Sequence, residues 1–152
     1  MSLLFSILML LQSPAHDVPK KEVAALQSAV DAVAIPAVAR LMQPSKATYL
    51  DGYGMIVTLE AALETPRNLF SSPASPSEVQ ASVARRRKDL TEKLAAFLKQ
   101  RIATMEFIGP SESLAVAVYI PNYTPADVPY LPAQIVFTVK KAFPEQVAVR
   151  EF

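Results

Sequence analysis

The pattern of apolar and polar residues divides the chain into helical and strand-like segments. Between Lys20 and Met42, apolar residues recur at steps of three and four, which is the spacing of one face of an α-helix. Six residues form this stripe: Val23, Leu26, Val30, Val33, Ala37 and Leu41. Pro36 removes a backbone donor inside the pattern, so we expect a kink near Ala34 and Ile35 or two short helices in sequence.

Two strand-like runs flank Asp51-Gly52 and predict a β-hairpin. Residues 46–50 and 53–60 are rich in β-branched, aromatic and aliphatic side chains. Asp-Gly favours a two-residue type I′ turn, because both central positions of that turn need positive φ. Such a turn places Tyr49 opposite Gly54, with the aromatic ring covering the strand glycine.

The longest helical pattern follows a Pro- and Ser-rich loop at residues 64–77. Ser75 has the position of an N-cap, Pro76 that of the first helical residue, and Glu78 that of the capping-box partner. An apolar stripe then continues to about Met105. Its earlier members are Val79, Val83, Leu90, Leu94, Phe97, Leu98 and Ile102.

Two further strands are predicted at residues 114–120 and 134–139, joined by a connection at 121–132 that contains four Pro. The tail at residues 144–152 alternates weakly, which fits a short edge strand or a helical turn. The strands follow one another as neighbours rather than through helical crossovers. We therefore predict an α+β domain with a mainly antiparallel sheet of about four strands. The long helix packs on one face, and the order is helix, hairpin, helix, two strands.

The N-terminal residues predict an export signal. Residues 3–11 form an apolar run whose helix would reach only about 14 Å, against a hydrocarbon core of about 30 Å. Ser13 and Ala15 supply the small residues that a signal peptidase requires. We predict cleavage after Ala15, a single domain at residues 16–152, and a periplasmic or extracellular location without a stable membrane anchor. An uncleaved tether and a buried N-terminal segment are the alternatives to a signal peptide at residues 1–15.

Composition restricts the chemistry available to this domain. The chain has 152 residues, of which 51% are apolar, enough for the core of one domain. The absence of Cys excludes disulfides and thiolate chemistry, and the single histidine, His16, falls at the expected mature N-terminus. With 15 basic and 14 acidic side chains the net charge is +1, which gives no bulk attraction to nucleic acid. We expect no metal, no cofactor and no nucleic-acid partner.

Residues 49–60 read Tyr-Leu-Asp-Gly-Tyr-Gly-Met-Ile-Val-Thr-Leu-Glu. This segment resembles a loosely defined group of exported bacterial proteins of unknown function, in which a Tyr-Leu-x-Gly-Tyr-Gly strand precedes a long charged helix. A strand pair like residues 113–120 and 131–140 follows there, so the resemblance spans roughly residues 46–141. It implies this order of elements, export, and at most an envelope-signalling context, since some members are encoded near sigma-factor and anti-sigma systems.

The densest charge run, residues 85–88, contains three Arg and one Lys and reads as a solvated helix face or as a site for phosphate or an acidic partner. The apolar stripe of the long helix must pass through Arg86 or Arg87. One of these guanidinium groups is therefore expected to extend from the core edge or to form a buried ion pair with Glu60 on the hairpin.

Three tyrosines in and next to the Pro-rich connection are candidate partner-binding residues: Tyr119, Tyr123 and Tyr130. Stiff aromatic side chains bind a partner at low entropic cost. The alternative is that the connection covers a sheet edge.

Catalytic motifs are missing from the sequence, including Gly-x-Ser-x-Gly, Ser-x-x-Lys and His-Glu-x-x-His. A carboxylate-dependent hydrolase would have to use acid–base pairs from Asp51, Glu60 and Glu64. We predict instead a non-enzymatic, exported domain that binds a protein partner or a second copy, since the stripe of the first helix favours homodimerisation. A small-molecule or lipid carrier with an apolar helix–sheet pocket is the other alternative.

Overall fold

The computed structural model describes residues 18, 20–65, 70 and 72–152. The predicted cleavage site and His16 lie outside the described residues. The elements in chain order are α1 (Lys20–Ala34), the 3-10 turn η1 (Ile35–Ala37), β1 (Arg40–Leu50), β2 (Gly54–Ala62), α2 (Pro76–Thr104), β3 (Ser113–Tyr119), β4 (Gln134–Lys140) and β5 (Phe143–Glu151).

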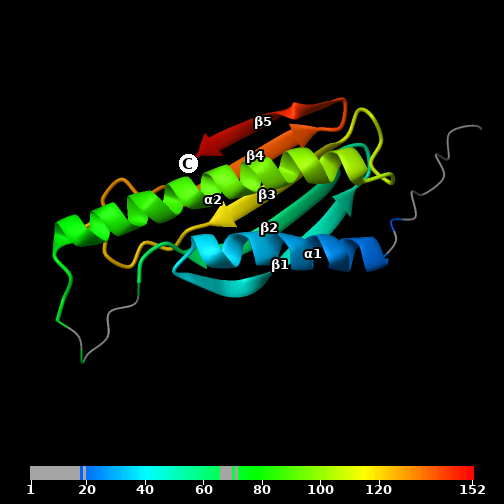
Figure 1. Ribbon diagram of the computed structural model, residues 1–152. Coiled ribbons are helices and arrows are strands. Elements are labelled where there is room, and N and C mark those ends of the chain that lie inside the picture. The colour runs from blue at the N-terminus through cyan, green and yellow to red at the C-terminus, as the bar shows by residue number, and fades with distance from the viewer. Residues whose placement is uncertain (1–17, 19, 66–69, 71) are drawn as a thin grey trace, which may run out of the picture.

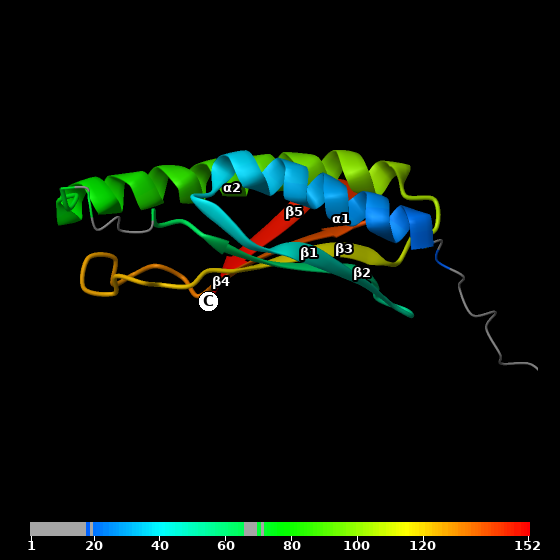
Figure 2. The same cartoon turned by 90° about the horizontal axis from the view of Figure 1, so that it is seen from below.

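The molecule has two layers. Five strands form one sheet in the order β1-β2-β3-β4-β5, and both helices lie on the same side of it (Figure 1, Figure 2). In the part of the chain that the structure describes, no helix or strand covers the other side, as Figure 2 shows. The α+β class is therefore confirmed, with one helical layer on one sheet face.

The prediction of about four mainly antiparallel strands is wrong in two respects. The tail forms a fifth strand, β5, which pairs antiparallel with β4. In addition, β2 and β3 are parallel, because α2 connects them as a crossover. Its 29 residues span about 43 Å at roughly 1.5 Å per residue. That length returns the chain to the end of the sheet where β2 began, as a parallel pair requires.

The first helix is shorter than its apolar stripe predicts. It ends at Ala34, and Pro36 lies in the single 3-10 turn that follows. Val38 is already extended, with φ −107° and ψ 165°. The break at Pro36 is confirmed, but residues 40–42 lie in β1, where Arg40 pairs with Ala62 of β2.

The hairpin turn is one residue longer than predicted. The N–H of Tyr53 donates to the carbonyl of Leu50 at 3.0 Å, and the strands pair Leu50 with Gly54 and Tyr49 with Met55. A shift of one residue moves every side chain to the opposite face. The ring of Tyr49 therefore lies on the helix side, and it does not cover Gly54.

The need for glycine at position 54 comes from β3. Gly54 has φ +114°, and a Cβ atom built on it would lie 2.1 Å from the carbonyl oxygen of Ser113. The same approach lets the N–H of Ser113 donate to the carbonyl of Tyr53 at 2.7 Å. The close contact between β2 and β3 thus requires a residue without a side chain.

The predicted start of the long helix is confirmed in detail. The N–H of Glu78 donates to Oγ of Ser75 at 3.3 Å, and the N–H of Ser75 donates to Oε2 of Glu78 at 2.8 Å. These two bonds satisfy backbone donors that a helix start leaves free. Hydrogen bonds from the backbone and side chain of Ser75 lower the pKa of Glu78.

The core lies between the two helices and the sheet. Phe137 of β4 is fully buried and is the largest side chain there. Of the predicted α2 stripe, Val79 and Phe97 are half-buried and the others are buried. The buried helical residues are Leu26, Val30 and Ala34 of α1, and Val83, Leu90, Leu94, Leu98 and Ile102 of α2.

The β1 edge of the sheet is bound to α1 at an irregular point of the strand. The N–H of Ser45 donates to Oδ1 of Asp31 at 2.9 Å, and Nε2 of Gln27 donates to the carbonyl of Ser45 at 3.2 Å. Oγ of Ser45 also donates to the carbonyl of Gln27 at 3.0 Å. Pro44, the preceding residue, has no N–H to offer.

Among the described residues, none of the helices has the length and apolar character needed to cross a membrane.

Candidate functional site

We call the side of the sheet that no described helix or strand covers the open face (Figure 2). Side chains alternate along each strand, so every second residue points away from the helices. The central members come from β2, β3 and β4 and lie beside one another in register. They are Ile56, Thr58, Ala115, Ala117, Val136 and Thr138.

The centre of the open face is small and apolar. Ala115 is 4% exposed and Ala117 is 8% exposed, although no described helix or strand covers them, because the side chains of the adjacent strands surround their methyl groups. Larger apolar side chains stand around this centre and are strongly exposed. They are Leu50, Tyr119, Phe143 and Phe152, with exposed fractions between 46% and 66%.

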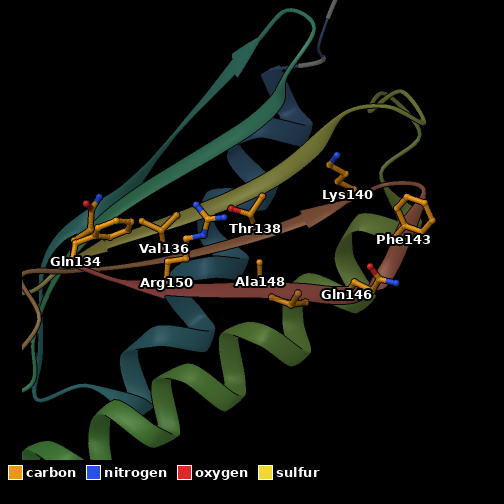
Figure 3. A pocket seen from close by; sticks show the side chains of 10 residues that line it. Gln134, Val136, Thr138, Lys140, Phe143, Gln146, Ala148 and Arg150 are labelled. Carbon is orange, nitrogen blue, oxygen red and sulfur yellow. The ribbon is translucent and has the colours of Figure 1, made fainter.

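A shallow hollow of about 730 Å³ lies on the open face above β4 and β5. Figure 3 shows the side chains of Val136, Thr138, Lys140 and Arg150 standing on this side of the two strands. The side chains of its ten lining residues include two cations and no Asp or Glu. They are Gln134, Val136, Thr138, Lys140, Phe143, Gln146, Val147, Ala148, Arg150 and Phe152.

Charges on the open face are mostly positive. Four basic residues point to this side or lie at its corner, namely Arg40, Lys46, Lys140 and Arg150, whereas Glu60 is its single acidic strand residue. The ion pairs that the structure gives for the described residues lie instead in the helical layer or between it and the sheet. They join Arg87 to Glu151, Lys88 to Glu92, Lys99 to Glu145 and Arg101 to Glu22.

The arginines of the charge run have partners other than Glu60. Nη1 of Arg86 donates to the carbonyl of Leu63 at 2.9 Å. Arg87 holds Glu151 of β5 through two hydrogen bonds, of which the one from Nε to Oε1 measures 2.8 Å. Glu60 follows the buried Leu59 in β2, so strand alternation directs it to the open face, away from α2. The pairing of Arg87 with Glu151 was not predicted, because the sequence of the tail fitted either a strand or a helical turn.

The three candidate tyrosines are exposed but lie in different settings. Tyr119 ends β3 on the open face, where it pairs with Glu60 of β2 and Gln134 of β4. Tyr123 lies in the connection and its hydroxyl contacts the sulfur of Met42 at 3.8 Å. Tyr130 is 91% exposed at the far part of that connection. Tyr119 is therefore a strand residue of the open face, whereas Tyr123 lies at its corner, in a hollow that Arg40 and Ala62 also line.

A second hollow of about 470 Å³ lies where the Pro-rich connection meets the ends of β1 and β2. Glu64 is buried at its side, and its carboxylate accepts hydrogen bonds from the N–H of Tyr123 at 3.0 Å and from Oγ1 of Thr124 at 2.6 Å. Both oxygens are thus used to hold the connection in place. The hollow also includes Arg40.

The carboxylates considered for acid–base chemistry are spread along the hairpin. Asp51 lies in the turn before β2, Glu60 lies near the other end of that strand, and Glu64 anchors the Pro-rich connection. Within the described ranges, no group of three or more His, Asp or Glu side chains is arranged to hold a metal ion.

The residues of the hollow above β4 and β5 were not among the candidates from sequence. The available signal was the alternation in residues 143–152, which separates Gln146, Ala148 and Arg150 from Glu145 and Glu151. Comparisons with protein-family models, with curated proteins and with solved structures found no match. The resemblance to a group of exported bacterial proteins therefore stays a prediction.

Proposed function

We propose that this chain is an exported, non-enzymatic binding domain that holds a protein partner on the open face of its sheet. The observation that carries the proposal is the character of that face, which is uncovered, apolar at its centre and ringed by exposed Leu50, Tyr119, Phe143 and Phe152. Large apolar side chains gathered on one exposed face favour an interaction site there.

A protein fits this surface better than a small molecule does. Small ligands bind in concave sites that bury most of their surface, whereas the open face extends across five strands. A carrier would need room between the helices and the sheet. That interface is filled by side chains with no exposed surface, such as Leu26, Leu94 and Phe137.

The hydrolase alternative has weaker support. Glycoside hydrolysis by two carboxylates needs them on either side of the scissile bond, within about 10 Å of each other. Asp51 and Glu60 lie toward opposite ends of β2, and the carboxylate of Glu64 is already hydrogen-bonded at both oxygens. These positions favour a binding role over acid–base catalysis.

Charge favours a different protein over a second copy of this chain as the partner. Two identical open faces stacked on each other would each bring an excess of positive charge to the contact, from residues such as Lys46, Lys140 and Arg150. Like charges at an interface disfavour association. A partner with complementary charge avoids this repulsion.

Export is supported by the apolar run at residues 3–11 and by the small residues Ser13 and Ala15 at the predicted cleavage site after Ala15. Cleavage there would leave every described helix and strand in place, because α1 begins at Lys20. N-terminal sequencing of exported material tests this part of the proposal. A chain that keeps Met1 or stays in the cytoplasm would contradict it.

Site-specific photo-crosslinking in the native cell tests the open face. A photoreactive amino acid is placed at Thr48 or Thr58 on the open face, and at Lys93 or Ala96 on the solvent side of α2 as matched controls. We expect a discrete covalent adduct from the first pair alone. Adducts of equal yield from both faces, or none from the open face, would refute a partner site there.

A further inference from the structure

The alternation of β5 sorts its charges between the two sides of the sheet. Glu145 and Glu151 point to the helix side, where Lys99 lies 3.6 Å from Glu145 and Arg87 pairs with Glu151. Arg150 points to the open face. The two acids of β5 are therefore held away from the hollow above β4 and β5.

Two cations line that hollow without acidic neighbours. Lys140 and Arg150 are both exposed, and neither takes part in an ion pair within the described part of the chain. The remaining polar lining consists of the amides of Gln134 and Gln146 and the hydroxyl of Thr138. Amides both donate and accept hydrogen bonds, so they suit the backbone of a bound chain.

From these observations we infer that the hollow binds an acidic segment of a partner protein in extended conformation. The inference rests on the proposed function and names the chemistry of the partner. Charge complementarity carries it, because the side chains of the lining combine two cations that form no ion pair among the described residues with amides and apolar patches, and include no Asp or Glu.

The spacing of the two cations sets the spacing of the acids. Arg150 pairs with Val136, which lies four residues from Lys140 along β4. This corresponds to about 13 Å at roughly 3.3 Å per residue. In an extended segment, side chains at positions i and i+4 lie on the same side and the same distance apart. One acid therefore meets Lys140 and the other meets Arg150.

The middle of the hollow specifies the residue between the two acids. Thr138 and Ala148 pair with each other halfway between the cations and present a methyl group each. A small apolar side chain at position i+2 packs there. Phe143 and Phe152 line the same hollow and offer aromatic surface to the flanking residues of the segment.

A synthetic peptide tests this geometry on the full chain. The probe is fluorescein-labelled Ser-Glu-Thr-Val-Thr-Glu-Ser, measured by fluorescence polarisation at low salt. Two control peptides replace both Glu by Gln, or move the second Glu one position earlier so that it points to the opposite side. We expect each control to bind at least about tenfold more weakly, with binding of the probe falling as salt rises.

Matched charge reversals locate the site on the protein. The double variant Lys140→Glu and Arg150→Glu changes exposed residues on the open face, and Lys88→Glu with Lys93→Glu makes the same change in net charge on α2. Circular dichroism checks that both variants fold. We expect the first pair to weaken probe binding by at least about tenfold and the second to leave it within about twofold.

Several outcomes would overturn the inference. The first is that the peptide with Gln in place of both Glu binds as tightly as the probe. The second is that the Lys88 and Lys93 variant loses as much probe binding as the Lys140 and Arg150 variant. The third is that heparin or phosphatidylglycerol vesicles bind at Lys140 and Arg150 while the peptide does not. If one of these outcomes is found while Thr48 and Thr58 still give adducts, the acidic segment is refuted and the proposed function stands. If photoreactive residues at Thr48 and Thr58 give no adduct in a protein that keeps Lys140 and Arg150, both the acidic segment and the proposed function are refuted.

Discussion

The hydroxyl of Tyr49 in β1 donates a hydrogen bond of 2.6 Å to Oε1 of Glu112, 63 residues later in the chain. The other oxygen of Glu112 accepts from the N–H of Gly109 at 2.8 Å. Glu112 is only 8% exposed, so both bonds compensate for the loss of water around its carboxylate. This contact joins the hairpin to the segment that leads into β3.

Replacing Tyr49 with Phe removes this donor and leaves one carboxylate oxygen of Glu112 without it. We expect the free energy of unfolding to fall by about 1–3 kcal/mol, the usual cost of a buried polar group that loses its partner. Urea denaturation followed by circular dichroism measures the change. Tyr130→Phe is the matched control, because Tyr130 is almost fully exposed, and an equal effect there would contradict the assignment.

The same contact makes stability depend on alkaline pH. The hydrogen bond to Glu112, together with burial and the charge of that carboxylate, raises the pKa of Tyr49 to about 12 from its ordinary value of 10.0. The folded state thus keeps a proton that the unfolded chain releases, and stability falls as pH rises from about 10 to about 12. Tyr49→Phe is expected to show a shallower loss over this range, and parallel profiles would argue against the coupling.

Gly54 is expected to tolerate no side chain. In Gly54→Ala the new Cβ would lie 2.1 Å from the Ser113 carbonyl oxygen, so β2 and β3 must move apart. We expect a loss of at least about 3 kcal/mol in unfolding free energy. Gly52→Ala is the control, since Gly52 also has positive φ, but a Cβ atom added there would meet no other atom within 4 Å. Its expected cost is about 1–2 kcal/mol.

Lys141 stabilises the end of α2. Its Nζ donates to the carbonyls of Ile102, Ala103 and Met105 at 2.8, 3.2 and 2.9 Å, where the helix no longer supplies its regular i to i+4 hydrogen bonds. Lys141→Met should cost about 1–2 kcal/mol and speed amide hydrogen exchange in the last turn of α2. Lys140→Met, one residue earlier on the open face, is the control. It should leave the unfolding free energy and the amide exchange of the last turn of α2 unchanged within experimental error.

Local features of the sequence predicted local structure well. The capping box at Ser75 and Glu78 depends only on residues three apart, and the α2 stripe is repeated over many turns, so both are confirmed. The break at Pro36 follows from the missing N–H of one residue. These features need no information about the rest of the chain.

Features that depend on distant segments were not predictable in the same way. The hairpin turn is one residue longer than predicted, and the glycine after it, Gly54, lies against Ser113 of β3. The parallel pairing of β2 and β3 depends on where α2 returns the chain. The partner of Arg87 lies 64 residues away in Glu151. The hollow with Lys140 and Arg150 forms only because the tail is a strand, β5. The weak alternation of the tail fitted a helical turn as well as a strand.

The attachment of Ser45 to Asp31 and Gln27 limits how copies of this protein can assemble through their sheets. At this point of the β1 edge α1 binds both the N–H and the carbonyl of Ser45, and Pro44 has no N–H to offer an incoming strand. A strand that approaches the β1 edge would therefore meet a break in its ladder of hydrogen bonds. Because a fibre needs two usable edges on every molecule, this break disfavours growth of the sheet from one copy to the next. The short tether between α1 and β1 is in this sense a protection against polymerisation.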